Sequence, residues 1–123
     1  MKVTRSTERW REDVKQPQGR FRGRAQQRVL HETPLSARVS FVSFEPGAHT
    51  HWHTHSGGQV LQVVEGSLRV QSWGEAIQSL EVGDASTTPP DEKHWHGAGP
   101  DGPMTHLAIT CGEVQWFEDA EPS

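Results

Sequence analysis

The sequence predicts an all-β fold, either a β-sandwich or a small barrel. Its 123 residues suit a single domain. Short segments rich in β-forming residues recur about every ten residues, separated by glycine and proline turns, and the body has no long apolar pattern of helical period. We expect an irregular arm over residues 1–19, a barrel domain over 20–119 and a short tail over 120–123.

The strand candidates are bounded by turn residues. Pro46-Gly47 ends the first β-rich segment, and Pro89-Pro90 interrupts the chain again further on. Glu65-Gly66 stands between two apolar segments and predicts a tight hairpin there. The predicted strands are 39–44, 60–64, 68–72, 85–88, 105–110 and 114–117.

The composition excludes several classes of protein. The chain contains no tyrosine, so mechanisms with a tyrosine base or nucleophile are excluded. Its one cysteine, Cys111, rules out an internal disulfide and fits a reducing compartment, so we expect a cytoplasmic protein. No run approaches the roughly 20 apolar residues of a membrane helix, and the first residues lack an apolar signal region, so we expect no membrane partner and no secretory signal.

Charge is distributed unevenly along the chain. The formal net charge is −4, yet residues 1–28 carry nine Lys or Arg against three acids, a net of +6, and the remainder carries −10. A basic arm of this kind is one signature of nucleic-acid binding. Only Trp10 is interleaved among these charges before Phe21, and no binding motif accompanies them. We therefore expect no nucleic-acid partner and interpret the arm as packing on the acidic body of its own or a neighbouring subunit.

Histidine is the outstanding residue type. Eight are present, and seven of them lie between positions 49 and 106. Side chains of a strand alternate between its two faces, so histidines two residues apart share a face and are well placed to bind one cation. The seven comprise two stretches with His-x-His spacing and one histidine in the 105–110 strand: His49, His51, His53 and His55; His94 and His96; and His106.

A simpler interpretation of histidines is available. A lone histidine is usually a surface residue or a hydrogen-bonded core residue, and a surface array can bind metal adventitiously. His-x-His spacing in two separate stretches of one small β domain weakens this interpretation. It stays open for His49 and His51, which follow Pro46-Gly47 and precede the strand, and we interpret these two as exposed or as an adventitious array.

Two segments resemble the two sequence motifs of the cupin superfamily. The first contains Gly47, His53-Thr54-His55, Gln59 and Gly66, and the second contains Gly83, Pro89 and His94. Sixteen residues separate Gly66 from Gly83. The resemblance implies a double-stranded β-helix, the jelly-roll barrel of cupins, with six strands in two sheets and a metal ion at its centre.

The resemblance also implies a ligand set. Carried over by position, it makes His53, His55, Gln59 and His94 the ligands of one divalent transition metal per chain, and this donor set suits Mn, Fe, Ni, Cu or Zn. Cupins usually have glutamate where this chain has Gln59. A neutral amide leaves the full charge of the ion uncompensated, so we expect stronger attraction of anions and a weaker hold on the metal. Asp91 fills a glycine position of the motif, a turn geometry that aspartate tolerates, and Ala98 fills an asparagine position.

A closer resemblance is to small bacterial cupins that include manganese-dependent hydroxynitrile lyases. It extends from about residue 21 to residue 118 and rests on the segments 52–55, 58–59, 93–98 and 104–109. It favours manganese and implies a lyase that cleaves cyanohydrins, or forms them from an aldehyde and cyanide. It further implies that His106, or else His96, takes the proton of the substrate hydroxyl. A neutral imidazole suits this role, and a nearby cation keeps it neutral.

Two other functions stay open at this level. One is a metal-dependent dioxygenase of the quercetinase type, and the other is a non-catalytic cupin that binds a small molecule. A lyase works without oxygen, an oxygenase consumes it, and a binding protein is stabilised by its ligand without turnover. Small cupins commonly pair through their sheets, so we also expect a homodimer or higher homo-oligomer.

Overall fold

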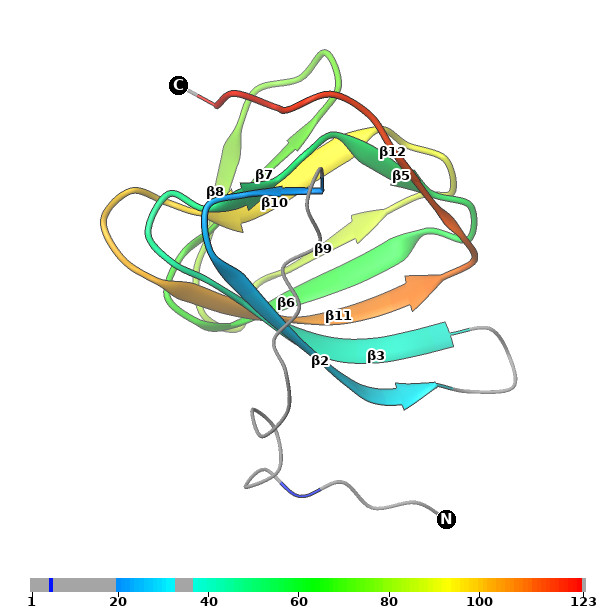
Figure 1. Ribbon diagram of the computed structural model, residues 1–123, viewed down its shortest axis with the longest axis horizontal. Helices are drawn as coiled ribbons and strands as arrows, with labels where there is room; N and C mark the ends of the chain where they lie inside the picture. Colours follow the sequence, from blue (N-terminus) through cyan, green and yellow to red (C-terminus); the bar gives the residue numbers. More distant parts are fainter. Residues whose placement is uncertain (1–4, 6–19, 33–36, 123) are drawn as a thin grey trace.

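The computed structural model describes residue 5 and residues 20–32 and 37–122. All regular elements within these ranges are β-strands, so the predicted all-β fold is confirmed. The strands form two antiparallel sheets that face each other and curl into a barrel (Figure 1). No helix in the described ranges is long and apolar enough to cross a membrane. The predicted arm over 1–19 lies outside the described residues, apart from Arg5.

The two sheets hold seven and five strands and form the upper and lower layers of Figure 1. The seven-stranded sheet has the order β1 (Phe21–Arg22), β4 (His49–Thr50), β10 (His94–Ala98), β5 (His53–His55) and β12 (Val114–Trp116), with β7 (Leu68–Ser72) paired to β10 and β8 (Gln78–Leu80) paired to β7. The five-stranded sheet has the order β2 (Ala25–Glu32), β3 (Ala37–Phe44), β11 (Met104–Cys111), β6 (Gln59–Glu65) and β9 (Ala85–Thr88).

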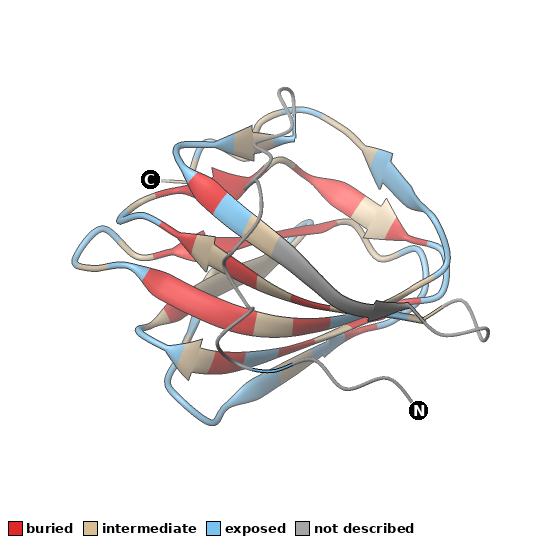
Figure 2. Cartoon of the chain, turned by 60° about the horizontal axis from the view of Figure 1, so that its bottom comes forward, coloured by how far each residue is buried: buried red, intermediate tan, exposed pale blue. Residues whose placement is uncertain are grey.

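Alternating burial shows which faces of the strands point into the barrel. Every second residue is buried along β6 from Gln59 to Val63 and along β3 from Ser40 to Phe44. Strand β10 is buried along its whole length, as expected for a central strand covered on both faces. In Figure 2 the buried segments lie along the strands that enclose the interior.

The interior has an apolar end and a polar end. Along β11 the inward side chains pass from Met104 to His106 and then Thr110, and along β10 they pass from Ala98 back to His94. Each strand therefore contributes to an apolar core at one end and to a group of imidazoles at the other. The core consists of Ala25, Val42, Phe44, Ala48, Leu61, Val63, Leu68, Ala98, Met104 and Ala108.

The predicted hairpin at Glu65-Gly66 is wrong, although both flanking strands are present. Strand β6 belongs to the five-stranded sheet and β7 to the seven-stranded sheet, so this turn carries the chain from one sheet to the other. Gly66 has a φ of +75°, and a Cβ there would lie 2.1 Å from the carbonyl oxygen of Pro103. The turn signal is genuine, but β6 pairs with β11 and β7 with β10, strands that lie far along the chain.

Candidate metal centre

His53 and His94 lie directly opposite each other on neighbouring strands. Strands β5 and β10 pair at these two residues, and the ring centroids are 4.3 Å apart. The Nδ1–H of His53 donates to the carbonyl of His51 at 2.8 Å, and the Nδ1–H of His94 donates to the carbonyl of Glu92 at 3.0 Å. Each contact fixes the tautomer and leaves a lone pair on Nε2, which is how a histidine is prepared to bind a metal.

Two further residues converge on this pair. His55 shares a face of β5 with His53, and its ring centroid lies 4.9 Å from that of His53 and 5.6 Å from that of His94. Both of its ring nitrogens are buried without a hydrogen-bond partner. Gln59 comes from β6 in the other sheet, and its Oε1 lies 3.1 Å from Nε2 of His94. The fold thus brings together the four residues that the resemblance proposes as ligands.

The contact between His94 and Gln59 sets two acceptor atoms against each other. Burial lowers the pKa of His94, so its ring is neutral, with the proton on Nδ1 and a lone pair on Nε2. The amide oxygen of Gln59 also offers only lone pairs. These atoms cannot hydrogen bond to each other, whereas a cation bound by both would satisfy them and also one of the two unpartnered nitrogens of His55. The residues therefore fit a metal ion.

A further buried histidine, His96, adjoins the pair. Ligand atoms of His53, His94 and His96 all lie within 4.8 Å of one another, so these three could hold one metal ion. The alternative triad replaces His96 by His55. Nδ1 of His96 is engaged by His106, whereas neither nitrogen of His55 has a partner. His55 lies outside this group of three, but a bound metal would also supply a partner for one of its ring nitrogens.

His106 reaches the same region from β11 in the opposite sheet. Its Nε2 lies 3.0 Å from Nδ1 of His96, so the two rings share one hydrogen bond. Nδ1 of His106 is buried and has no partner. Phe44 packs against both rings, with centroids 6.0 Å and 5.6 Å away. The two rings are thus linked to each other, and one ring nitrogen of His106 is left without a partner.

Burial keeps the histidines of this cluster uncharged. Loss of hydration lowers the pKa of His55 to about 4 and that of His106 to about 3. Burial, reinforced by neighbouring imidazoles, lowers the pKa of His53 and His96 well below 6.5. Neutral imidazole is the form that binds metal, and a divalent ion held only by neutral ligands keeps its full positive charge.

Known proteins resemble this chain in sequence and in fold. Residues 40–110 match the family model described as "Cupin domain". The chain belongs to the cupin family. A relative from Granulicella tundricola, named "(R)-mandelonitrile lyase", is 45% identical over 110 residues, which cover 85% of this cupin and 84% of the relative.

Solved structures extend the comparison. A cupin-like protein from Thermotoga maritima is 36% identical to this cupin, with a TM-score of 0.81 and coverage of 85% of this chain and 84% of its own. An acetylacetone dioxygenase from Acinetobacter johnsonii is 14% identical, with a TM-score of 0.75 and coverage of 99% of this chain and 80% of its own. The second likeness is one of fold alone, since one cupin barrel can carry different chemistries.

Four histidines of this cupin line a cavity of about 620 Å³, a size that suits a small organic ligand. His53, His55, Gln59, His96 and His106 all contribute to its wall. The lining also includes exposed residues near the opening and partly buried aromatic side chains: Arg20, Arg38, Glu113, Val114, Phe21 and Trp116. The cavity combines imidazoles with apolar surface and an opening that carries two arginines and one glutamate.

Some residues around the centre were not predicted from the sequence. The hydroxyl of Thr110 accepts a hydrogen bond from Nε2 of Gln59 at 2.9 Å, which turns the amide oxygen toward His94. Thr110 lies 51 residues from Gln59, and only the pairing of β11 with β6 makes them neighbours. Arg20 and Arg38 at the opening were also missed, because no motif marks them.

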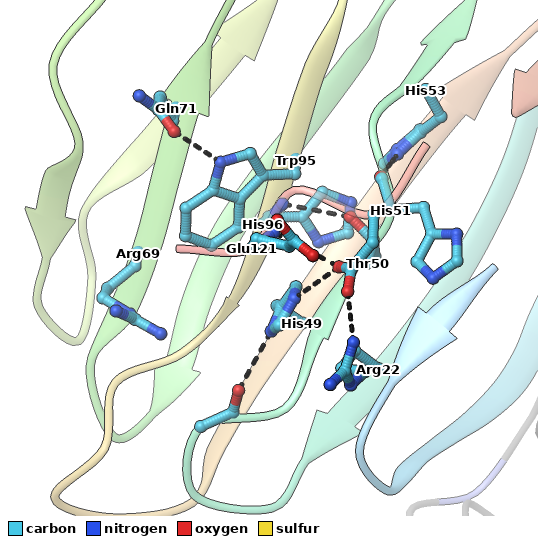
Figure 3. Close-up of polar contacts among 12 residues, drawn as sticks. Arg22, His49, Thr50, His51, His53, Arg69, Gln71, Trp95, His96 and Glu121 are labelled. Atoms are coloured by element: carbon cyan, nitrogen blue, oxygen red, sulfur yellow. Dashed lines mark hydrogen bonds and ion pairs between the residues drawn. The ribbon is translucent and has the colours of Figure 1, made fainter. Parts of the chain in front are cut away.

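The interpretation of His49 as exposed is wrong. His49 lies in β4 and is 6% exposed. Its Nε2 is 3.0 Å from Oδ1 of Asp119, whose other oxygen pairs with Arg22, and its Nδ1 is 3.1 Å from the carbonyl of Gly47 (Figure 3). His51 is half-buried and holds His53 through its carbonyl. The acid that binds His49 is 70 residues away in sequence, so local spacing carries no sign of it.

Proposed function

We propose that this cupin is a metal-dependent lyase that cleaves or forms cyanohydrins. The observation that carries the proposal is that one cavity is lined both by candidate metal ligands and by the neutral His106–His96 pair. The relative named "(R)-mandelonitrile lyase", 45% identical over 85% of this chain, supports the same reaction.

Under this proposal His53, His55, Gln59 and His94 hold one divalent transition metal, with manganese favoured. A divalent ion there would supply a Lewis acid for the substrate hydroxyl and a positive charge that stabilises departing cyanide. None of these four ligands is a carboxylate, so the charge of the centre is not reduced. The four residues thereby provide an environment that attracts anions such as cyanide.

His106 removes the hydroxyl proton of the cyanohydrin at Nδ1. This role requires the tautomer in which Nε2–H of His106 donates to Nδ1 of His96 across their 3.0 Å contact, because that tautomer leaves a lone pair on the unpartnered Nδ1. As the proton leaves, the carbon–oxygen bond becomes a carbonyl, the bond to the nitrile carbon breaks, and its electron pair departs with cyanide. The imidazolium of His106 then returns the proton to cyanide, giving an aldehyde and hydrogen cyanide. The same steps in reverse form the cyanohydrin.

The rest of the cavity accommodates the organic part of the substrate. Phe21, Val114 and Trp116 provide apolar lining, and the cavity of about 620 Å³ leaves room for an aryl or alkyl group. Arg20 lies over the ring of Trp116, with its guanidinium carbon 5.9 Å from the ring centroid, and this contact helps to hold the wall in place.

An anaerobic assay tests the reaction. Purified protein of measured metal content is incubated with mandelonitrile, and we expect it to release benzaldehyde and cyanide without oxygen. In a parallel aerobic assay, oxygen consumption with no cyanide release would instead indicate a dioxygenase. A ligand-induced rise in Tm without turnover would indicate a binding protein. Metal-free protein prepared with a chelator is the control for metal dependence.

A further inference from the structure

A second cleft reaches the candidate metal centre from a different side. It has a volume of about 420 Å³ and lies between the β7–β8 hairpin, β9 and the turn that precedes β10. His94 lines this cleft and does not line the main cavity, whereas His53, His55 and Gln59 line the main cavity and not the cleft. Because His94 contacts Gln59 at 3.1 Å, these two residues form part of the partition between the two spaces.

The cleft is rich in oxygen atoms. Polar residues make up most of its lining, among them Ser72, Ser86, Thr88, Glu75 and Glu92. The Oγ of Ser86 is buried without a partner, and the carboxylate of Glu92 accepts a hydrogen bond from Ser72 at 3.3 Å. Oxygen ligands and water suit hard or borderline divalent cations, so this lining suits the passage of a hydrated ion.

The two openings also differ in charge. Arg20 and Arg38 outnumber Glu113 at the main cavity, whereas the cleft carries Glu75 and Glu92 and, among the described residues that line it, no Lys or Arg. Lys93 follows Glu92 in sequence, but its Nζ is held by Glu118 at 2.6 Å and by the Trp73 ring at 3.6 Å. A cleft lined by one sign of charge concentrates ions of the opposite sign.

We propose that this acidic cleft is the route by which the divalent metal ion enters and leaves the centre, while the main cavity serves the substrate. The proposal rests on the proposed function in taking these histidines to be the metal centre. An ion drawn in by Glu75 and Glu92 reaches His94, whose ring is fixed by the Glu92 carbonyl at 3.0 Å, before the ligands of the main cavity. Substrate in the main cavity then leaves metal exchange unobstructed.

Metal exchange kinetics test the route. Full-length protein is loaded with Co²⁺, whose visible absorption reports the bound ion. Stopped-flow measurements then time its release into excess chelator and its uptake by the metal-free protein. Ser86→Phe fills the cleft, so we expect it to slow uptake and release by the same factor, about tenfold or more, with the equilibrium Kd unchanged. The unchanged Kd also shows that the variant is folded.

A charge variant and a matched control complete the design. Glu75→Gln combined with Glu92→Gln should slow uptake several-fold at low ionic strength, and salt should abolish the difference. Glu113→Gln removes one charge of the same sign from the other opening and should leave the uptake rate unchanged. Unaltered rates in Ser86→Phe and in the double variant, or slowing by Glu113→Gln alone, would overturn the route and leave the lyase proposal standing. Wild-type protein that binds no Co²⁺ would overturn both.

Discussion

His49 and His53 stand four residues apart in one alternating stretch and lie in the same sheet, yet their surroundings are opposite. His49 has an oxygen partner at each ring nitrogen, Asp119 at Nε2 and Gly47 at Nδ1, and Arg22 also binds Asp119. His53 faces His94, and within the described part of the chain no carboxylate hydrogen bonds to either ring. The comparison teaches that free ring atoms matter: both nitrogens of His49 have partners, whereas Nε2 of His53 keeps a lone pair that a metal could use.

The largest expected effect is a difference in metal content between a variant at His94 and a variant at His49. His94→Ala removes the imidazole that contacts both Gln59 and His53, so purified protein should contain almost no metal by elemental analysis. His49→Ala, the matched removal of a histidine from the same sheet, should retain the wild-type stoichiometry. Full metal occupancy in His94→Ala would remove this residue from the ligand set.

Turnover should separate the proton-transfer pair from the metal ligands. His106→Ala should keep its metal, because His106 reaches the cluster only through His96. Its kcat with mandelonitrile should fall by about 10²–10⁴-fold, the usual contribution of a general base. Normal turnover would transfer the role to His96 or to water.

Loss of the Thr110 hydroxyl, which orients the amide of Gln59, should have a smaller effect on metal binding. Thr110→Val removes the acceptor for the amide nitrogen, so the amide can turn its NH₂ toward Nε2 of His94 and compete with the metal. The metal Kd should weaken by about 10–100-fold, as found for other groups that orient ligands. Thr110→Ser keeps the hydroxyl and should restore the wild-type value in the same calorimetric titration. Equal affinities in all three proteins would show that the amide is held by other contacts.

As the pH falls, the buried histidines of the metal centre should be the first groups to destabilise the fold. The folded pKa of His55 is about 4 and that of His106 about 3, below the ordinary value of 6.5, so the unfolded chain takes up protons more readily. The free energy of unfolding of metal-free protein should therefore be at its full value above pH 6.5 and fall as the pH drops toward 4. Each unit of difference in pKa corresponds to about 1.4 kcal/mol. Urea titrations between pH 7 and 4 measure the slope, and a flat profile would contradict it.

The contact between His49 and Asp119 should affect the free energy of unfolding at lower pH, and by a smaller amount, than the central histidines do. Burial raises the pKa of Asp119, but hydrogen bonds from His49, the Glu121 N–H and Arg22 outweigh this and lower it on balance. Its contribution is therefore present above the ordinary value of 3.8 and lost as the pH falls further. Asp119→Asn should cost about 1 kcal/mol at pH 7 without loss of metal, and the gap to wild type should close below pH 3.8. A gap that already closes between pH 6 and 5 would assign the effect to another group.

Much of the strand pattern was predictable from the sequence. All six predicted strands match observed ones to within two residues at each end. Six observed strands were not among them: β1, β2, β4, β5, β8 and β10. The hairpin at Glu65-Gly66 was wrong because local turn residues do not determine which distant strand pairs with each flanking strand. For the candidate site, the histidines with period-two spacing do lie side by side, His53 with His55 and His94 with His96. The interpretation of His49 as exposed rested on its place after Pro46-Gly47 and was wrong, because the distant Asp119 covers its ring.

The sequence by itself determined those features that depend on a single strand or a single turn. Alternation placed histidines on shared faces, and Asp91 adopts a φ of +63°, the left-handed geometry of the glycine position that it fills. Only the tertiary structure decided that β5 pairs with β10 at His53 and His94, and that the opposite sheet brings Gln59 and His106 to them. The reason is physical: the periodicity of a strand is a local property of its dihedral angles. Strand register, burial and lowered pKa values arise only when distant segments pack together.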